Sequence, residues 1–335
     1  MLLHFFVVLI ASALLTGLIR YYALKRKVLD IPNQRSSHTT PTPRGGGLAI
    51  VLVFFLACLF LLFTQQLDTA RFFALNAPLL VAAIGFYDDH APVAARWRFL
   101  IHIISALLAL LFINGMPAIV IPFPSSELVL NLGLFAYLLG MLLLVWQLNL
   151  FNFMDGTDGI AASEALFVSL AIAGFVYSLD QTLFTVCVCL AAGCLGFLCW
   201  NWPKAKIFMG DVGSGFIGFL LGLLILMAAK LDAILFWCGL IVFGLFMVDA
   251  TYTLLTRILT GQKWYDAHCS HTYQKLAKRY GHLRVLQFSW LINCLWLLPV
   301  SIAVFFYPNF ALVGLIVAYL PLFFIAYRCK AGLID

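Results

Sequence analysis

Two aspartates in a short glycine turn, Asp155 and Asp158, directly follow an apolar run that ends with two asparagines. Asn149 and Asn152 are spaced so that a helix would place both amides on one face. Inside an apolar run, each amide needs a partner or a ligand. The turn lacks the further oxygen ligands and the closing Glu of an EF-hand, which argues against calcium. Four polar groups at this spacing indicate a binding or catalytic site rather than a structural feature.

A pair of adjacent aspartates, Asp88 and Asp89, stands at the end of another apolar run, and Arg96 and Arg98 follow shortly after. Adjacent carboxylates at a membrane boundary are costly unless a positive charge compensates them. Mg²⁺ held by one or two carboxylates together with substrate phosphates would provide that charge. A solvated helix end that pairs with its own arginines explains this motif equally well when it is taken alone.

A third aspartate, Asp211, lies in a glycine-rich turn at the start of an apolar run and follows Lys204 and Lys206. The N-terminus of a helix attracts phosphate. Because Asp211 would repel a bare phosphate, a metal ion between the two is the economical interpretation. The alternative is a simple N-cap by Asp211 or Ser214.

A loop rich in proline and glycine follows the first apolar run and carries His38 and Arg44. Its three glycines, 45–47, would let backbone N–H groups approach an anion closely, and Arg44 adds positive charge. A turn that leads into the next helix is the better interpretation of this loop when it is taken alone.

Two histidines, His268 and His271, stand in the longest loop of the second half of the chain. Their spacing could suit zinc, but a third ligand nearby and the Glu of an HExxH motif are both missing. Hydrogen bonding to a phosphate or a sugar is the preferred interpretation. The alternative is a solvated loop that happens to contain histidine.

The composition shows what kind of scaffold must position these groups. The chain has 335 residues, of which 64% are hydrophobic and only 10% charged. A soluble domain carries about 25% charged residues, so lipid must be the solvent for most of this chain. We expect an all-α polytopic membrane protein that forms a single integral membrane domain over residues 1–335.

Apolar runs predict about eleven transmembrane helices, with uncertain ends. They lie at about 3–20, 46–64, 72–87, 99–114, 133–151, 160–178, 181–200, 214–230, 233–255, 286–307 and 310–327. The break between the sixth and seventh runs is only Leu179-Asp180-Gln181, so a tight turn must separate them. The first run has no basic residue before it, which predicts a retained helix rather than a cleaved signal peptide.

The basic residues predict the orientation of these helices. With the N-terminus outside, every Lys and Arg except Arg71 and Lys230 falls on an inside segment, as the positive-inside rule requires. The C-terminus is then cytoplasmic, and the net charge of +6 reflects topology rather than nucleic-acid binding. The longest outside loop, 115–132, has the pattern of a small β-hairpin.

All five polar clusters fall on inside segments in this topology. A transporter would more naturally bury its ionisable groups near the middle of the bilayer. Carboxylates, cations and glycine-rich turns on one face instead indicate an enzyme that takes a charged soluble substrate from the cytoplasm and a lipid substrate from the bilayer. A phosphate at the reacting centre fits this combination.

The order of the motifs is similar to that of a known family. Asp-x-Pro-Asn, Pro-x-Pro-x-Gly-Gly, Asp-Asp, Asn-x-x-Asn-x-x-Asp-Gly-x-Asp-Gly, Gly-Asp-x-Gly-Ser and His-x-x-His, between about residues 30 and 284, resemble the polyprenyl-phosphate N-acetylhexosamine-1-phosphate transferases, glycosyltransferase family 4. Arg96-Trp97-Arg98 and the segment 268–274 resemble the branch that initiates O-antigen or related surface polysaccharides.

The resemblance implies a reaction and a location. Undecaprenyl phosphate would attack the β-phosphorus of a UDP-N-acetylhexosamine with Mg²⁺, or Mn²⁺, as cofactor; UMP would leave and undecaprenyl-diphosphate sugar would form. The sugar would be N-acetylglucosamine, or alternatively a 6-deoxy sugar of the N-acetylfucosamine type. The protein would lie in the bacterial cytoplasmic (inner) membrane and act in cell-envelope biogenesis, and a homodimer would be compatible with the resemblance. A lipid-linked-sugar transporter with a degenerate site is the alternative from another class.

The resemblance also implies roles for individual residues. The expected catalytic residues are Asp88, Asp89, Asp155, Asp158 and Asp211, of which Asp211, Asp88 and Asp89 would bind the metal ion. The expected substrate-binding residues are His38, Arg44, Arg96, Arg98, Asn149, Asn152, Lys204, Lys206, His268 and His271.

Overall fold

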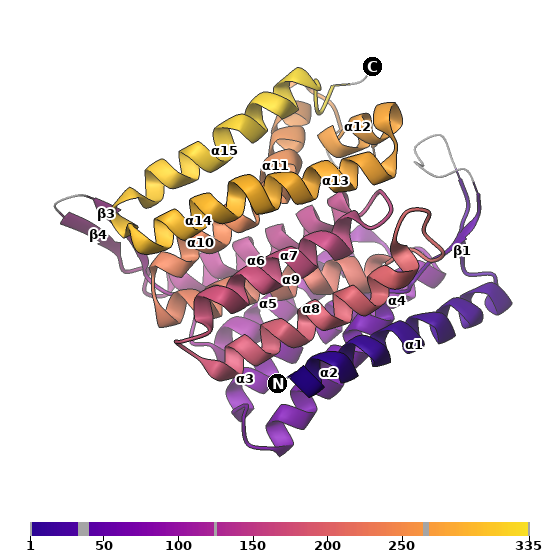
Figure 1. The fold of residues 1–335 in the computed structure, drawn as a ribbon, viewed down its shortest axis with the longest axis horizontal. Helices are drawn as coiled ribbons and strands as arrows, with labels where there is room; N and C mark the ends of the chain where they lie inside the picture. Colours follow the sequence, from indigo (N-terminus) through magenta and orange to yellow (C-terminus); the bar gives the residue numbers. More distant parts are fainter. Residues whose placement is uncertain (1, 33–39, 124–125, 264–267, 334–335) are drawn as a thin grey trace.

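The structure is a computed structural model that describes residues 2–32, 40–123, 126–263 and 268–333. It is a helical bundle with two short hairpins and no larger sheet among these residues (Figure 1). The α-helices are α1 Leu2–Arg26, α2 Leu48–Phe63, α3 Thr69–Asn76, α4 Leu79–His90, α5 Ala95–Phe112, α6 Phe135–Met154, α7 Ile160–Val176, α8 Gln181–Asn201, α9 Asp211–Leu231, α10 Ile234–Val242, α11 Gly244–Leu259, α12 Thr272–Tyr280, α13 His282–Ile292, α14 Leu298–Phe306 and α15 Ala311–Arg328. A π-helical segment, η1 Asn293–Leu297, joins α13 to α14, and a 3₁₀ turn, η2 Pro308–Phe310, precedes α15.

The expected all-α membrane fold is confirmed. Eight of the described helical segments are long and apolar enough to cross a membrane, and the pair α10 and α11, bent by 71°, would make a ninth. Two shorter apolar helices, α2 and α7, occupy two more of the predicted runs. The count of eleven spans and the orientation of the chain remain predictions.

The break between α7 and α8 is as tight as the sequence predicts. Asp180 caps α8 by accepting the backbone N–H of Leu183 at 2.8 Å, and its carboxylate also forms an ion pair with Arg71. The Asp180 carboxylate therefore stabilises the start of α8 and links the turn between α7 and α8 to α3.

The central helix of the bundle is α9, which is buried from Val212 to Ala229. Its main neighbours are α6 and α4. Gly85 on α4 allows this packing, because a Cβ there would lie 2.5 Å from the backbone oxygen of Asp211. The close approach brings the carboxyl end of α4 against the start of α9, so the Asp-Asp motif meets Asp211.

The polar loops and the β3–β4 hairpin lie at opposite ends of the bundle. Strands β3 Ile119–Phe123 and β4 Ser126–Leu130 pair antiparallel, which confirms the predicted hairpin. Strands β1 Leu29–Asp30 and β2 Thr42–Pro43 form the second hairpin, and Figure 1 shows β1 and α12 at the end away from β3 and β4. The chemistry is thus collected at one end of the helices.

Candidate active site

Four of the five sequence motifs meet around one cavity of about 230 Å³. The cavity lies where the glycine turn after α6, the end of α4 and the start of α9 converge. Its lining residues are Asp30, Arg44, Asp89, Asn152, Asp155, Gly156, Thr157, Asp158, Asn201, Phe208, Gly210, Asp211, Ser214 and Gln274.

Arg98 joins two of the expected catalytic carboxylates. Its guanidinium lies 2.8 Å from Asp88 Oδ2 and 2.9 Å from Asp211 Oδ2. The second Asp88 oxygen accepts the backbone N–H of Val93 at 2.7 Å. A planar guanidinium can hold two carboxylates in fixed directions, which an ammonium group cannot do. Arg98 therefore fixes Asp211 relative to the Asp-Asp motif.

The other oxygen of Asp211 is held from α6. Asn152 donates from Nδ2 to Asp211 Oδ1 at 2.9 Å and lies equally close to the Ser214 hydroxyl. The predicted need of Asn152 for a partner is thus met by α9. Asn149 instead donates to the carbonyl of Val145 at 2.7 Å and lines a separate, very small cavity with Arg98.

Asp89 caps the start of α9 from a different helix. Its carboxylate accepts the backbone N–H groups of Asp211 and Val212 at 3.1 and 3.2 Å. A carboxylate at this position compensates the positive end of the helix dipole. Arg44 approaches from the loop after β2, donates to the Asp89 carbonyl oxygen and places its Nε 3.9 Å from the carboxylate.

Asp155 faces the cavity without a hydrogen-bond donor on its carboxylate from the described residues. Burial, then the charges of Asp211 and Asp89, raise the pKa of Asp155 well above its usual value. Three carboxylates are therefore crowded around a small space. A cation in the cavity would relieve their repulsion, since an opposite charge favours the ionised form.

Asp158 is held in a network that fixes the glycine turn. Its carboxylate lies 3.2 Å from His282 Nδ1 and accepts the backbone N–H of Ala205 at 3.2 Å. The next residue, Gly159, has a positive φ of 76° and donates its N–H to Asn201 Oδ1 at 2.9 Å. Asp158 is thus a cavity-lining group whose orientation is set by α13 and by the loop after α8.

The donor set suits a magnesium ion shared with a substrate. In the part of the chain that the structure describes, no three His, Cys, Asp or Glu side chains form a cluster that could hold a metal ion. Mg²⁺ is commonly bound by one or two carboxylates together with substrate phosphates rather than by an all-protein cage. Asp89, Asp155 and Asp211 line the cavity, and Asp155 is the one of these three whose carboxylate accepts no hydrogen bond from the described residues. Asp88 does not line the cavity and is engaged by Arg98 and the Val93 N–H.

Several predicted substrate-binding residues point elsewhere. Arg96 is exposed and lies over the Trp97 ring. Lys204 and Lys206 are exposed, and Lys206 lies over the Trp200 ring at 5.6 Å. None of the three lines the cavity, and His38 lies outside the described residues.

The two predicted histidines lie beside the site rather than in it. His271 is buried, with Nδ1 3.4 Å from Asp249 Oδ1, and its ring stacks on His268 at 5.0 Å. Burial, then the charges of His271 and Arg257, lower the pKa of His268 to about 4. The side chain from this segment that does line the cavity is Gln274.

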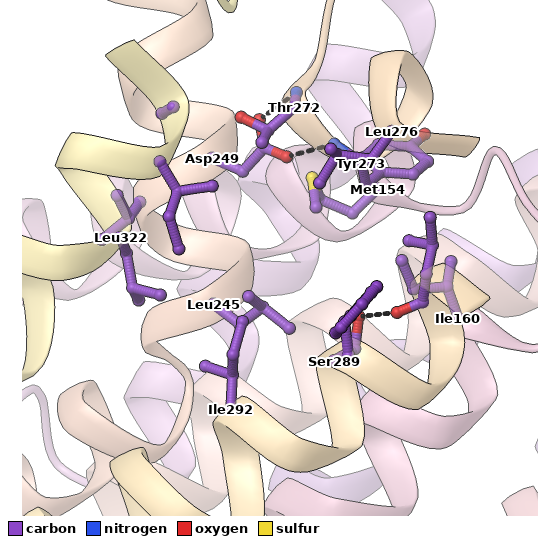
Figure 2. A pocket seen from close by; sticks show the side chains of 15 residues that line it. Met154, Ile160, Leu245, Asp249, Thr272, Tyr273, Leu276, Ser289, Ile292 and Leu322 are labelled. Atoms are coloured by element: carbon purple, nitrogen blue, oxygen red, sulfur yellow. Dashed lines mark hydrogen bonds between the residues drawn. The ribbon is translucent and has the colours of Figure 1, made fainter. Parts of the chain in front are cut away.

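Asp249 on α11 holds the start of α12 and does not belong to any of the sequence motifs. Its carboxylate accepts the backbone N–H groups of Thr272 and Tyr273 at 2.9 and 3.0 Å (Figure 2). Tyr273 in turn donates its hydroxyl to the Phe153 carbonyl at 2.9 Å. The signal that could have identified Asp249 is its position as an ionisable group inside a membrane helix; His282 and Asn201 carry no comparable signal.

The chain is similar to known enzymes over most of its length. A model described as glycosyl transferase family 4 matches residues 71–229. The chain is 30% identical to the probable undecaprenyl-phosphate N-acetylglucosaminyl 1-phosphate transferase of Bacillus subtilis (strain 168), over 81% of this chain and 76% of that protein. It is 30% identical to the decaprenyl-phosphate N-acetylglucosaminephosphotransferase of Mycobacterium leprae (strain TN), over 88% and 81%.

A further relative is named for a different sugar phosphate. The phospho-N-acetylmuramoyl-pentapeptide-transferase of Moorella thermoacetica (strain ATCC 39073 / JCM 9320) is 31% identical over 63% of this chain and 69% of that protein. The family match over residues 71–229 includes Asp89, Asp155, Asp158 and Asp211, which line the cavity. The chain belongs to glycosyl transferase family 4, and within it to the polyprenyl-phosphate hexosamine-1-phosphate transferases.

Proposed function

We propose that this protein transfers N-acetylhexosamine 1-phosphate from a UDP-sugar to undecaprenyl phosphate, releases UMP and uses Mg²⁺. The reaction would take place at the cytoplasmic face of a bacterial inner membrane. The observation that carries the proposal is one cavity lined by both Asp155 and Asp211, with the Asp211 carboxylate held by Asn152 and Arg98.

The described side chains suit a transfer between two phosphates. Bound Mg²⁺ would neutralise the donor diphosphate, with Asp155 and Asp211 as its protein ligands. Arg44 supplies a positive charge to the lining of the cavity. Such reactions depend mainly on positioning and electrostatic stabilisation, and Arg98, Asn152 and the cap made by Asp89 are arranged to position Asp211.

The relatives support N-acetylglucosamine as the sugar. Two of those described above have N-acetylglucosamine phosphate transfer in their names, and a third is named for a phospho-N-acetylmuramoyl-pentapeptide. We retain O-antigen initiation as the proposed pathway on the resemblance of segments 96–98 and 268–274, although the names of the relatives given above do not mention O-antigen. A 6-deoxy sugar is the alternative donor.

The proposal is tested with purified protein in lipid nanodiscs. Release of UMP from UDP-N-acetylglucosamine should require undecaprenyl phosphate and Mg²⁺, and a panel of UDP-sugars identifies the donor. Asp211→Asn should abolish turnover and weaken Mg²⁺-dependent binding of the UDP-sugar together. Asp68→Asn, which changes an exposed carboxylate that caps α3, is the matched control.

Three outcomes are decisive. Absence of UMP release with every UDP-sugar would overturn the transferase proposal in favour of a transporter with a degenerate site. Full activity of Asp211→Asn would show that the Asp211 carboxylate is not part of the catalytic site. Turnover in the presence of the chelator EDTA would show that the reaction does not require a divalent metal ion.

A further inference from the structure

The segment 330–333 follows α15 and lies against α11 and α12 (Figure 1). Ala331 and Gly332 in this segment are buried. The backbone N–H of Gly332 donates to the Ser270 carbonyl at 2.9 Å, and the Gly332 carbonyl accepts a hydrogen bond from Gln262 Nε2 at 2.9 Å. The segment is therefore bonded to a residue that follows α11 and to a residue that precedes α12.

Gly332 allows the segment to approach α11 closely. Its φ is +80°, a backbone conformation that residues with a side chain rarely adopt. A Cβ at this position would lie 2.7 Å from the backbone oxygen of Thr253 and 2.7 Å from Cβ of Thr256. The position thus requires glycine both for its backbone conformation and for its contact with α11.

Lys275 on α12 makes a second connection to the same segment. Its Nζ donates to the carbonyl oxygens of Lys330 and Leu333, at 3.0 Å in each case. The Lys275 side chain is partly buried. An ammonium group has three donors and no acceptor, so Lys275 can hold both carbonyl groups at once and join α12 to the segment.

A simple cap of α15 does not explain these contacts. The cap is made by the backbone N–H groups of Lys330 and Ala331, which donate to carbonyl groups in the last turn of α15. Such bonds are the ordinary way to satisfy the end of a helix. The bonds to Lys275, Gln262 and Ser270 are additional, and they connect the segment to α12 and to the residues beside it.

Helix α12 contributes to the wall of the candidate active site. Gln274, directly before Lys275, lines the catalytic cavity, and its Oε1 accepts the His271 N–H at 3.2 Å. Asp249 holds the first turn of α12, so Lys275 is a second attachment that does not depend on Asp249. A helix attached at one point can still tilt, whereas a second attachment limits that tilt.

We propose that Lys275 and Gly332 are positioning residues for the UDP-sugar site. They join the segment 330–333 to α12 and α11, and so hold Gln274 at the wall of the cavity. Neither residue lines the cavity itself, so both act through Gln274. This assignment rests on the proposed function, because it names what orients one wall of the donor site of that reaction.

Four variants in nanodiscs test the proposal by separate KM values for the UDP-sugar and the acceptor. Lys275→Met removes both donations but keeps the aliphatic stem, and Gly332→Val forces the segment away from Thr253. Lys275→Arg keeps the charge and the donors. Lys278→Met is the matched control: it removes an exposed ammonium group from the same helix, where Nζ lies 3.4 Å from Cys269 Sγ.

Lys275→Met and Gly332→Val should each raise the UDP-sugar KM about fivefold, which corresponds to about 1 kcal/mol, and leave the acceptor KM unchanged. The two changes together should raise it no further than the larger single effect, because residues of one network do not act additively. Lys275→Arg should stay close to wild type, and Lys278→Met should change neither KM.

Lower melting temperatures with an unchanged UDP-sugar KM would show that the segment serves stability alone, and would overturn the proposal. An equal rise in KM with Lys278→Met would also overturn it, because the positive charge of α12 would then explain the effect. If Gly332→Val does not fold, the substitutions at positions 275 and 278 decide the question. An inactive wild type would instead refute the proposed function, whereas an active wild type with variants of normal UDP-sugar KM refutes only the positioning role.

Discussion

The carboxylate of Asp249 on α11 accepts the backbone N–H of Thr272 at 2.9 Å and so fixes the start of α12. The same helix carries Gln274, which lines the candidate active site. Asp249 is buried and also accepts a hydrogen bond from Thr253 at 3.2 Å. One buried carboxylate thus connects the bent pair α10 and α11 to a wall of the cavity.

Removing this carboxylate should affect stability and substrate binding together. Asp249→Ala leaves the first N–H groups of α12 unsatisfied, a loss that typically costs about 1 kcal/mol, and it frees Gln274 to move. Asp249→Asn keeps one acceptor oxygen and should have a smaller effect on both properties. Thermal unfolding and steady-state kinetics of the two variants measure this gradation.

Asp180→Ala is the matched control for that experiment. It also removes a carboxylate that caps a helix, but in the turn between α7 and α8. The variant should lose stability while the UDP-sugar KM stays unchanged. A similar rise in KM for Asp180→Ala and Asp249→Ala would show that reduced stability alone explains the kinetic effect.

The orientation predicted from the basic residues can be tested on two exposed positions. Thr260 follows α11 and Ser126 begins β4. In a background with Cys269 and Cys329 changed to Ser, an impermeant thiol reagent applied to whole cells should label Ser126→Cys and leave Thr260→Cys unlabelled. The opposite pattern would place the candidate active site outside the cell and contradict a cytoplasmic UDP-sugar as donor.

His268 should make the protein less stable in acid. Its pKa in the folded protein is lowered to about 4, whereas an unfolded histidine titrates near 6.5. Between these values the unfolded chain binds a proton that the folded protein does not, so stability falls as the pH drops from about 6.5 toward 4. His268→Asn should therefore lose less of its melting temperature than the wild type between pH 7 and pH 5; parallel profiles would contradict the assignment.

The sequence predicts the scaffold and much of the site because both depend on local patterns. Every predicted apolar run contains a helix, and Asp155, Asp158 and Asp211 line one cavity as their motifs indicate. The position of the Lys206 side chain could not be predicted from the local sequence pattern. It is close to Asp211 in the chain, yet the turn before α9 directs it over the Trp200 ring.

Asp249 and His282, which the sequence motifs did not identify, contact residues that are distant in the chain. Asp249 reaches α12 because α10 and α11 are bent by 71°, and hydropathy gives no sign of that angle. His282 meets Asp158 because the start of α13 lies against the turn between α6 and α7. Contacts of this kind depend on how helices pack, which the pattern of one segment does not contain.

The last prediction concerns the role of Asp88. A general base contributes roughly 10²–10⁴-fold where a proton must move. The proposed acceptor is a phosphate monoester, whose second pKa is about 6 if it resembles phosphoserine, so most of it is already ionised at pH 7. In the structure Asp88 is instead occupied by Arg98 and the Val93 N–H, and Arg98 also holds Asp211.

Asp88→Asn should therefore be impaired equally at pH 7 and pH 9, because further ionisation of the acceptor cannot restore the position of Arg98. Arg98→Lys should reproduce the loss, since an ammonium group cannot hold both carboxylates in the same geometry. The measurement is kcat for each variant relative to wild type at the two pH values. Recovery of most of the Asp88→Asn activity at pH 9, with Arg98→Lys still impaired, would show that Asp88 removes a proton and that its contact with Arg98 is secondary.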